Sequence, residues 1–115
     1  MRVFSMFVIA LLPGFGVASV SAQETTQAFR MAQTMGALMW CKNHQTSSPR
    51  DKIKYSVAIS TVKKELQRQT AAAKIPEQDV LPVVNRVAES GNFRKRNLNR
   101  EECEKIEKLV RTGQY

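Results

Sequence analysis

The sequence predicts an all-α protein: a compact, four-helix bundle-like domain with one disulfide, following a cleaved signal peptide. Three observations lead to this prediction. Apolar residues recur at helical spacing through most of the chain, strand-like alternation is almost absent, and the two cysteines follow an N-terminal segment typical of export. We expect residues 1–22 to be the signal peptide and residues 23–115 to form a single small helical domain.

The N-terminal segment predicts the compartment. Arg2 supplies a positive end, and residues 3–12 are apolar apart from one serine. This run is shorter than the roughly 20 apolar residues that span a bilayer, and a Pro-Gly pair separates it from the small-residue stretch VASVSA. We expect cleavage after Ala22, with a cut after Ala18 as the alternative, no transmembrane segment afterwards, and a periplasmic or secreted protein. An uncleaved N-terminal anchor is the competing interpretation.

The charge balance predicts the sign of the partner. The chain has 18 Lys and Arg against 10 Asp and Glu, and loss of residues 1–22 removes only Arg2, so the formal charge falls from +8 to +7. Such a balance favours an acidic protein surface or an anionic component of the cell envelope as partner. Nucleic acid is not expected, because no nucleic-acid motif is present and export argues against that partner.

Cys41 and Cys103 predict one intramolecular disulfide, since two cysteines in an oxidising compartment have only this pairing available. The bond would close a loop of about 62 residues, for which chain entropy gives a stabilisation of about 4 kcal/mol. Because Cys41 lies near the polar edge of its helix, we expect it to reach a neighbouring helix from the flank rather than from the deepest layer.

The first predicted helix spans Glu24 to Cys41. Its apolar residues cover an arc of about 200° at 100° per residue, so it should be covered on more than one side. The opposite arc carries Gln27, Arg30, Gln33 and Thr34.

The segment QTSSPRD ends this first helix and starts the second. Ser48 fits the N-cap, Pro49 the first helical position, and Asp51 lies three residues after the cap. The second helix should run to about Ala73. Its apolar stripe consists of Tyr55, Ile59, Val62, Leu66 and Ala73.

The third predicted helix is constrained by Pro82, which cannot lie in a helix interior without cost. With Asp79 as N-cap, Pro82 falls in the first turn, where backbone N–H groups lack intrahelical partners anyway. We expect this helix to end at about Ser90, before Gly91.

A capping box predicts the fourth helix, with Asn99 as N-cap and Glu102 three residues later. Acidic residues fill its first turn and basic residues its last turn, before Gly113, which suits the helix dipole. We expect one end of the core to contain Phe29, Trp40, Leu98 and Cys103, with Phe93 capping it from the preceding loop.

Candidate chemistry gathers around Cys41 and His44. Their Cys-x-x-His spacing supplies only part of a zinc site, and a nucleophilic Cys41 would need a free thiol and a third group to orient His44. The sequence has no Gly-rich phosphate loop, Gly-x-Ser-x-Gly elbow or His-Glu-x-x-His motif. We therefore expect no enzyme, no metal site and no cofactor.

The segment NFRKRNLNR is the predicted partner-binding site, because it places four cations within seven residues. The candidate binding residues are Phe93, Arg94, Lys95, Arg96 and Arg100. A solubilising loop without a partner is the competing interpretation.

The leading hypothesis is an exported non-enzymatic binding or accessory protein of the cell envelope, or a secreted effector, that docks an acidic partner through this basic loop. A periplasmic stress chaperone that exposes Met31 and Met35 on partial unfolding is the first alternative. A small enzyme that uses Cys41 and His44 is the second.

Overall fold

The computed structural model describes residues 13–115, with side chains from residue 26 onward. Of the predicted signal peptide, residues 1–12 lie outside the described residues, and residues 13–22 belong to the first helix. The predicted all-α class is confirmed, with one small hairpin between the last two helices. The elements are α1 (Pro13–His44), α2 (Pro49–Ala73), α3 (Glu77–Ser90), β2 (Asn92–Phe93), β3 (Arg96–Asn97) and α4 (Arg100–Arg111).

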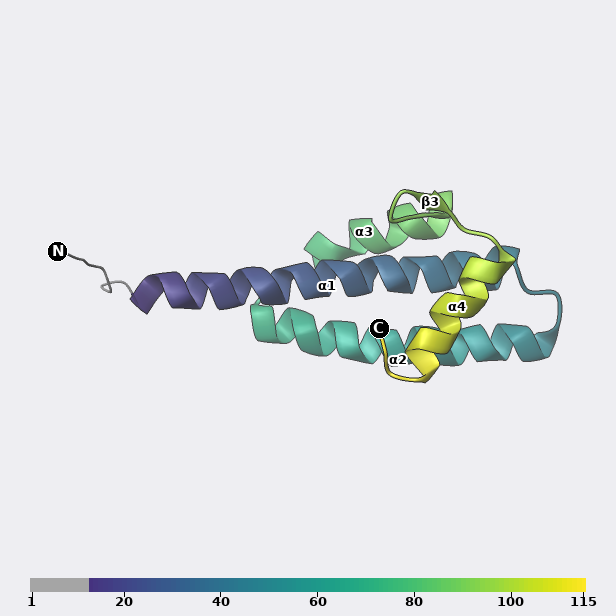
Figure 1. Cartoon of the computed structure of the whole chain (residues 1–115), viewed down its shortest axis with the longest axis horizontal. Helices are drawn as coiled ribbons and strands as arrows, with labels where there is room; N and C mark the ends of the chain where they lie inside the picture. The colour runs from purple at the N-terminus through teal and green to yellow at the C-terminus, as the bar shows by residue number, and fades with distance from the viewer. Residues whose placement is uncertain (1–12) are drawn as a thin grey trace.

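The central element is α1, and the other helices pack around it. Figure 1 shows α2 and α3 flanking α1, with α4 lying across α1 and α2. The α1 side chains of Ala32, Leu38 and Cys41 are completely buried, as expected for a helix covered on more than one side. Within residues 13–115, no helix is long and apolar enough to cross a membrane.

The start of α2 follows its sequence signals. The Ser48 hydroxyl accepts a hydrogen bond from the Asp51 backbone N–H at 3.1 Å, and Pro49 is the first helical residue. The buried residues of α2 recur at steps of three or four along one face, so this amphipathic helix packs its apolar stripe inward. They are Tyr55, Ala58, Val62 and Leu66.

The predicted start of α3 is wrong by three residues, since the N-cap is Pro76 and not Asp79. The helix begins at Glu77, after an extended Pro76, and the Asp79 N–H donates to the Pro76 carbonyl at 2.9 Å, so Asp79 lies in the first turn instead of capping it. Glu77 and Asp79 favour this earlier start because both carboxylates lie at the positive end of the helix dipole. Pro82 therefore lies inside the helix, at an exposed position, where it removes one backbone hydrogen bond.

A glycine allows α3 to approach α1 closely. A Cβ atom at Gly36 would lie 2.9 Å from the Cβ of Val87, so any larger residue would push α3 away.

The predicted Cys41–Cys103 disulfide is present, with the two Cα atoms 5.7 Å apart. The predicted N-cap of α4 is also present, since the Asn99 side chain accepts from the Glu102 N–H at 2.8 Å. The expectation that Cys41 bonds from the flank is wrong, because Cys41 is completely buried. The reason is that α4 crosses α1 near this point and covers what a single-helix projection shows as an edge.

The core consists of two clusters of buried side chains. The disulfide cluster contains residues of all four helices together with Leu98, and Trp40 and Phe93 pack against it. The distal cluster is formed by α1, α2 and α3, with Ala28, Leu66 and Val84 among its members. Phe29 packs on the distal cluster, so its expected place beside Trp40 and Cys103 is wrong. It lies eleven residues before Trp40, about 16 Å along the helix axis.

Candidate functional site

The predicted basic loop forms a tight β-hairpin. Antiparallel β2 and β3 pair Asn92 with Asn97 and Phe93 with Arg96, which leaves Arg94 and Lys95 as a two-residue turn. Both turn residues have positive φ angles, 52° and 69°, a conformation that usually selects Asn and Gly. An L-residue with a long side chain is strained there, and such strain is frequent at functional sites. The hairpin thus presents two cations at its tip at a cost in stability.

The base of the hairpin is fixed to the disulfide end of the molecule. The Leu98 N–H donates to the Gly91 carbonyl at 2.7 Å, and Leu98 is buried. Gly91 lies against the indole of Trp40, where a Cβ atom would come within 2.6 Å of the ring. Phe93 is half-buried against the disulfide cluster, which confirms that it covers this end of the core from the loop.

The four predicted cations fall into two groups. Arg96 lies 3.8 Å from a carboxylate oxygen of Glu102, and Arg100 lies 3.8 Å from one of Glu104. Both arginines are exposed, so these pairs are worth little energetically. Arg94 and Lys95, by contrast, have no carboxylate partner in the described part of the chain. The uncompensated charge of the hairpin is therefore at its tip.

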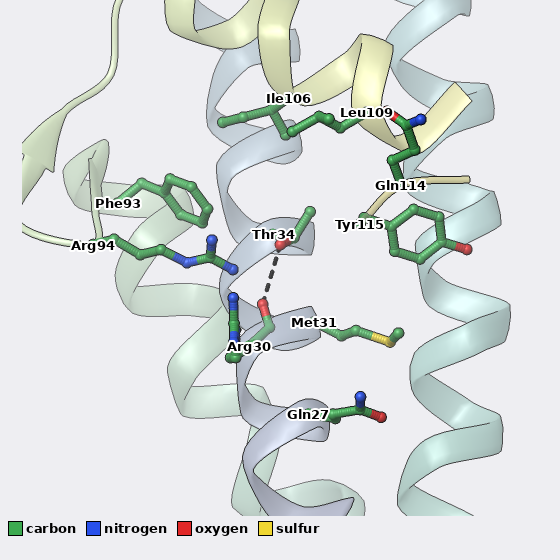
Figure 2. A pocket seen from close by; sticks show the side chains of 10 residues that line it. All are labelled: Gln27, Arg30, Met31, Thr34, Phe93, Arg94, Ile106, Leu109, Gln114 and Tyr115. Atoms are coloured by element: carbon green, nitrogen blue, oxygen red, sulfur yellow. Dashed lines mark hydrogen bonds between the residues drawn. The ribbon is translucent and has the colours of Figure 1, made fainter. Parts of the chain in front are cut away.

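A pocket of about 280 Å³ opens beside Arg94, between α1, the hairpin, α4 and the C-terminal residues (Figure 2). Arg94 extends from the hairpin toward Arg30 of α1, while Met31 and Tyr115 lie on the other side of the pocket. None of the described residues that line it is Asp or Glu. The residues that line the pocket are Gln27, Arg30, Met31, Thr34, Phe93, Arg94, Ile106, Leu109, Gln114 and Tyr115.

Arg94 and Arg30 give this pocket a positive end. The guanidinium of Arg94 lies over the Phe93 ring, 4.5 Å from its centroid, and its Nε donates a long hydrogen bond of 3.5 Å to the Gln33 side chain. Burial and the neighbouring Arg30 cation both lower the pKa of Arg94 below its ordinary value. Partial desolvation beside a like charge is unfavourable for a cation, and a bound anion would relieve it.

Three residues of this pocket, Gln27, Arg30 and Thr34, belong to the polar arc that the sequence predicted for the first helix. Arg30 lines the pocket next to Arg94 of the hairpin. Thr34 is buried, and its hydroxyl donates to the Arg30 carbonyl at 3.1 Å, so its polar group is satisfied within the helix. Helical spacing groups Gln27, Arg30 and Thr34 on one face, yet it carries no information on which element covers that face.

Trp40, Cys41 and His44 are held by a disulfide and by ring stacking. Cys41 is in the disulfide and supplies no free thiol. The exposed His44 ring stacks on Trp40 with centroids 4.7 Å apart, and its Nδ1 lies 3.0 Å from the Trp40 carbonyl oxygen. Over residues 13–115, no group of three or more His, Cys, Asp or Glu side chains could hold a metal ion.

No protein-family model matches the chain, and comparisons with curated proteins and with solved structures find no similar protein.

Proposed function

We propose that this chain is an exported, non-enzymatic binding protein that docks an acidic partner through the tip of its hairpin and the adjacent face of α1. The observation that carries the proposal is that Arg94 meets Arg30 at the pocket, next to Lys95 in the same turn, and that none of the three has a carboxylate partner in the described residues. Carboxylates or phosphates of a partner would supply the missing charge and accept charge-assisted hydrogen bonds from the guanidinium groups.

Export is supported by two independent features. The N-terminal 22 residues have the order of a signal peptide, with a positive end, an apolar run and small residues. The single pair of cysteines forms a buried disulfide, a bond that persists mainly in oxidising compartments. A cell-envelope accessory protein and a secreted effector are both compatible with these features.

The hairpin suits docking because its base is fixed while its tip is exposed. Gly91, Leu98 and Phe93 hold the base against Trp40 and the disulfide cluster. A binding element that is already ordered loses little conformational entropy when its partner arrives. The cations at the tip also raise the association rate with an acidic surface, in a way that salt suppresses.

The proposal is tested by reversing the charge of the hairpin tip. The variant Arg94→Glu/Lys95→Glu and the matched control Lys52→Glu/Lys64→Glu change the formal charge equally, and the control residues are exposed on α2. Each protein is purified from its native cell, immobilised, and exposed to an envelope extract at low and high salt. Captured proteins are then identified by mass spectrometry.

We expect the native protein and the control to capture the same acidic protein at low salt and to release it at high salt. The hairpin variant should capture at least about tenfold less, as expected for loss of about 1.4 kcal/mol of binding free energy. Equal capture by the hairpin variant and the control would contradict the proposal.

A further inference from the structure

We infer that the pocket beside the hairpin holds the C-terminal residue of the partner chain, with its free carboxylate between Arg30 and Arg94. This inference rests on the proposed function, and it adds which part of the acidic partner enters the molecule. It is argued from the two chemically different ends of the pocket and from its size.

The positive end of the pocket fits one carboxylate. Figure 2 shows Arg94 reaching from the hairpin toward Arg30, so two guanidinium groups approach the same space from different elements. A planar carboxylate has two oxygens and can accept hydrogen bonds from both groups at once. The Arg94 guanidinium contacts Phe93 and Gln33 and is partly desolvated, which strengthens its interaction with an anion.

The other end of the pocket is apolar. Met31 of α1 and Ile106 and Leu109 of α4 line it. Leu109 is 44% exposed, although the spacing of its helix would place it next to the buried Ile106 and Val110. A partner side chain lying on Leu109 and Met31 would remove this apolar surface from water, at roughly 25 cal/mol for each Å² covered.

The volume of about 280 Å³ lies at the lower limit of the range of roughly 300–1,000 Å³ usual for drug-sized ligands. A single residue is therefore a better match than an extended molecule. In an extended peptide an internal acidic side chain and its neighbour point to opposite faces, so they would not enter one small pocket together. A C-terminal apolar residue carries its carboxylate and its side chain on the same Cα atom, and so presents both chemistries to the pocket.

The test compares three tetrapeptides with acetylated N-termini. The first, Gly-Ser-Gly-Leu, has a free carboxylate, and the second is the same peptide with an amidated end. The third, amidated Gly-Asp-Gly-Leu, has the charge of the first on an internal side chain. Binding to the exported protein is measured by calorimetry, and NMR chemical-shift changes locate the site. Octanoate serves as a fourth probe, for a free amphiphilic anion.

We expect the free-carboxylate peptide to bind at least about tenfold more tightly than both amidated peptides, because charged hydrogen bonds contribute about 1.5–3 kcal/mol. Arg30→Gln should remove most of this preference, while Arg86→Gln, an exposed position on α3, should leave it unchanged. Leu109→Ser should weaken binding of the free-carboxylate peptide and should not strengthen binding of the amidated peptides. Shift changes should centre on Met31, Thr34 and Leu109.

Equal binding of the free and amidated peptides, no detectable binding, or tighter binding of octanoate than of the peptide would overturn the inference. The proposed function would survive these results if Arg94→Glu/Lys95→Glu still abolished capture of the acidic partner. Conversely, a clear preference for the free carboxylate with unchanged capture by that variant would retain the pocket and reject the hairpin as the docking element.

Discussion

The two core clusters of this protein are stabilised in different ways. The disulfide cluster combines all four helices with a covalent bond between α1 and α4, and it carries the hairpin through Trp40 and Leu98. The distal cluster joins α1, α2 and α3 through side-chain packing alone. The hairpin is therefore built on the end that is fixed covalently, whereas Arg30 lies between Ala28 and Ala32 of the distal cluster. The other end depends on the shape and volume of its side chains.

Removing the disulfide should give the largest loss of unfolding free energy. The variant Cys41→Ala/Cys103→Ala should lose about 4 kcal/mol of unfolding free energy, because the bond closes a 62-residue loop in the unfolded chain. Denaturant unfolding measures the loss, and hydrogen exchange should show that protection falls most in α4 and around Trp40. Equal loss of protection in the distal cluster would show that the two ends unfold as one unit.

Truncating the distal cluster should give the next largest effect. Leu66→Ala should cost about 3 kcal/mol, because Leu66 is buried between α1 and α3 and its removal leaves a cavity. Val57→Ala on the same helix, where Val57 is 61% exposed, should change stability by less than about 0.5 kcal/mol. An increase of hydrogen exchange in α3 but not in α4 of the Leu66→Ala variant would show that the distal cluster opens without the disulfide cluster. A cost no larger than that of Val57→Ala would mean that the distal cluster contributes little.

Gly91→Ala should have a smaller effect, about 2 kcal/mol, and should act on the hairpin end. Its positive φ of 70° disfavours a side chain, and a Cβ atom would meet the Trp40 ring at 2.6 Å. Gly113→Ala is the control, because Gly113 has a similar φ of 74° but open space around it, so only about 1 kcal/mol should be lost. Thermal unfolding compares the two, and equal losses would show that contact with Trp40 is unimportant.

Alkaline pH should change stability only above about pH 10, so at neutral pH this effect is the smallest of the four. Burial in the disulfide cluster, with a further contribution from the Glu104 and Glu107 carboxylates, raises the pKa of Tyr55 to about 12. An unfolded tyrosine has a pKa of about 10, so the folded protein binds more protons between these values. The unfolding free energy should therefore fall as pH rises from about 10 to 12.

Urea unfolding at a series of pH values measures the slope of the unfolding free energy against pH. Tyr55→Phe should flatten it, since phenylalanine has no hydroxyl to titrate. An unchanged slope in Tyr55→Phe would assign the alkaline sensitivity to other groups.

Local rules predicted most of the helix boundaries. The caps at Ser48 and Asn99 depend on contacts three residues apart, and the stop at Gly91 depends on one backbone conformation, so each is encoded next to where it acts. The disulfide followed from counting, because two cysteines allow one pairing. The start of α3 was missed because Glu77 and Asp79 favour an earlier first turn more strongly than Pro82 disfavours it.

Features that depend on several elements were less predictable. The sequence identified the cations of the hairpin but not Arg30, because Arg30 joins them only where α1 passes the hairpin. The assignment of Phe29 to the wrong cluster has the same origin, since one apolar arc along a long helix can face different neighbours at its two ends. The burial of Glu107 was also missed. Its carboxylate accepts from Arg111 at 3.2 Å one turn later, which makes this position tolerable in the core.

The Cys41–Cys103 bond also determines what a protease can do to this molecule. The whole of α2, α3 and the hairpin lies between the two cysteines, so a single peptide-bond cut there leaves two fragments joined through sulfur. Exposed Lys74, in the connection between α2 and α3, is such a position. A nicked molecule would keep its mass, apart from one added water, until a reductant separates it. A protein with this connectivity can lose chain continuity without losing the covalent link between α1 and α4.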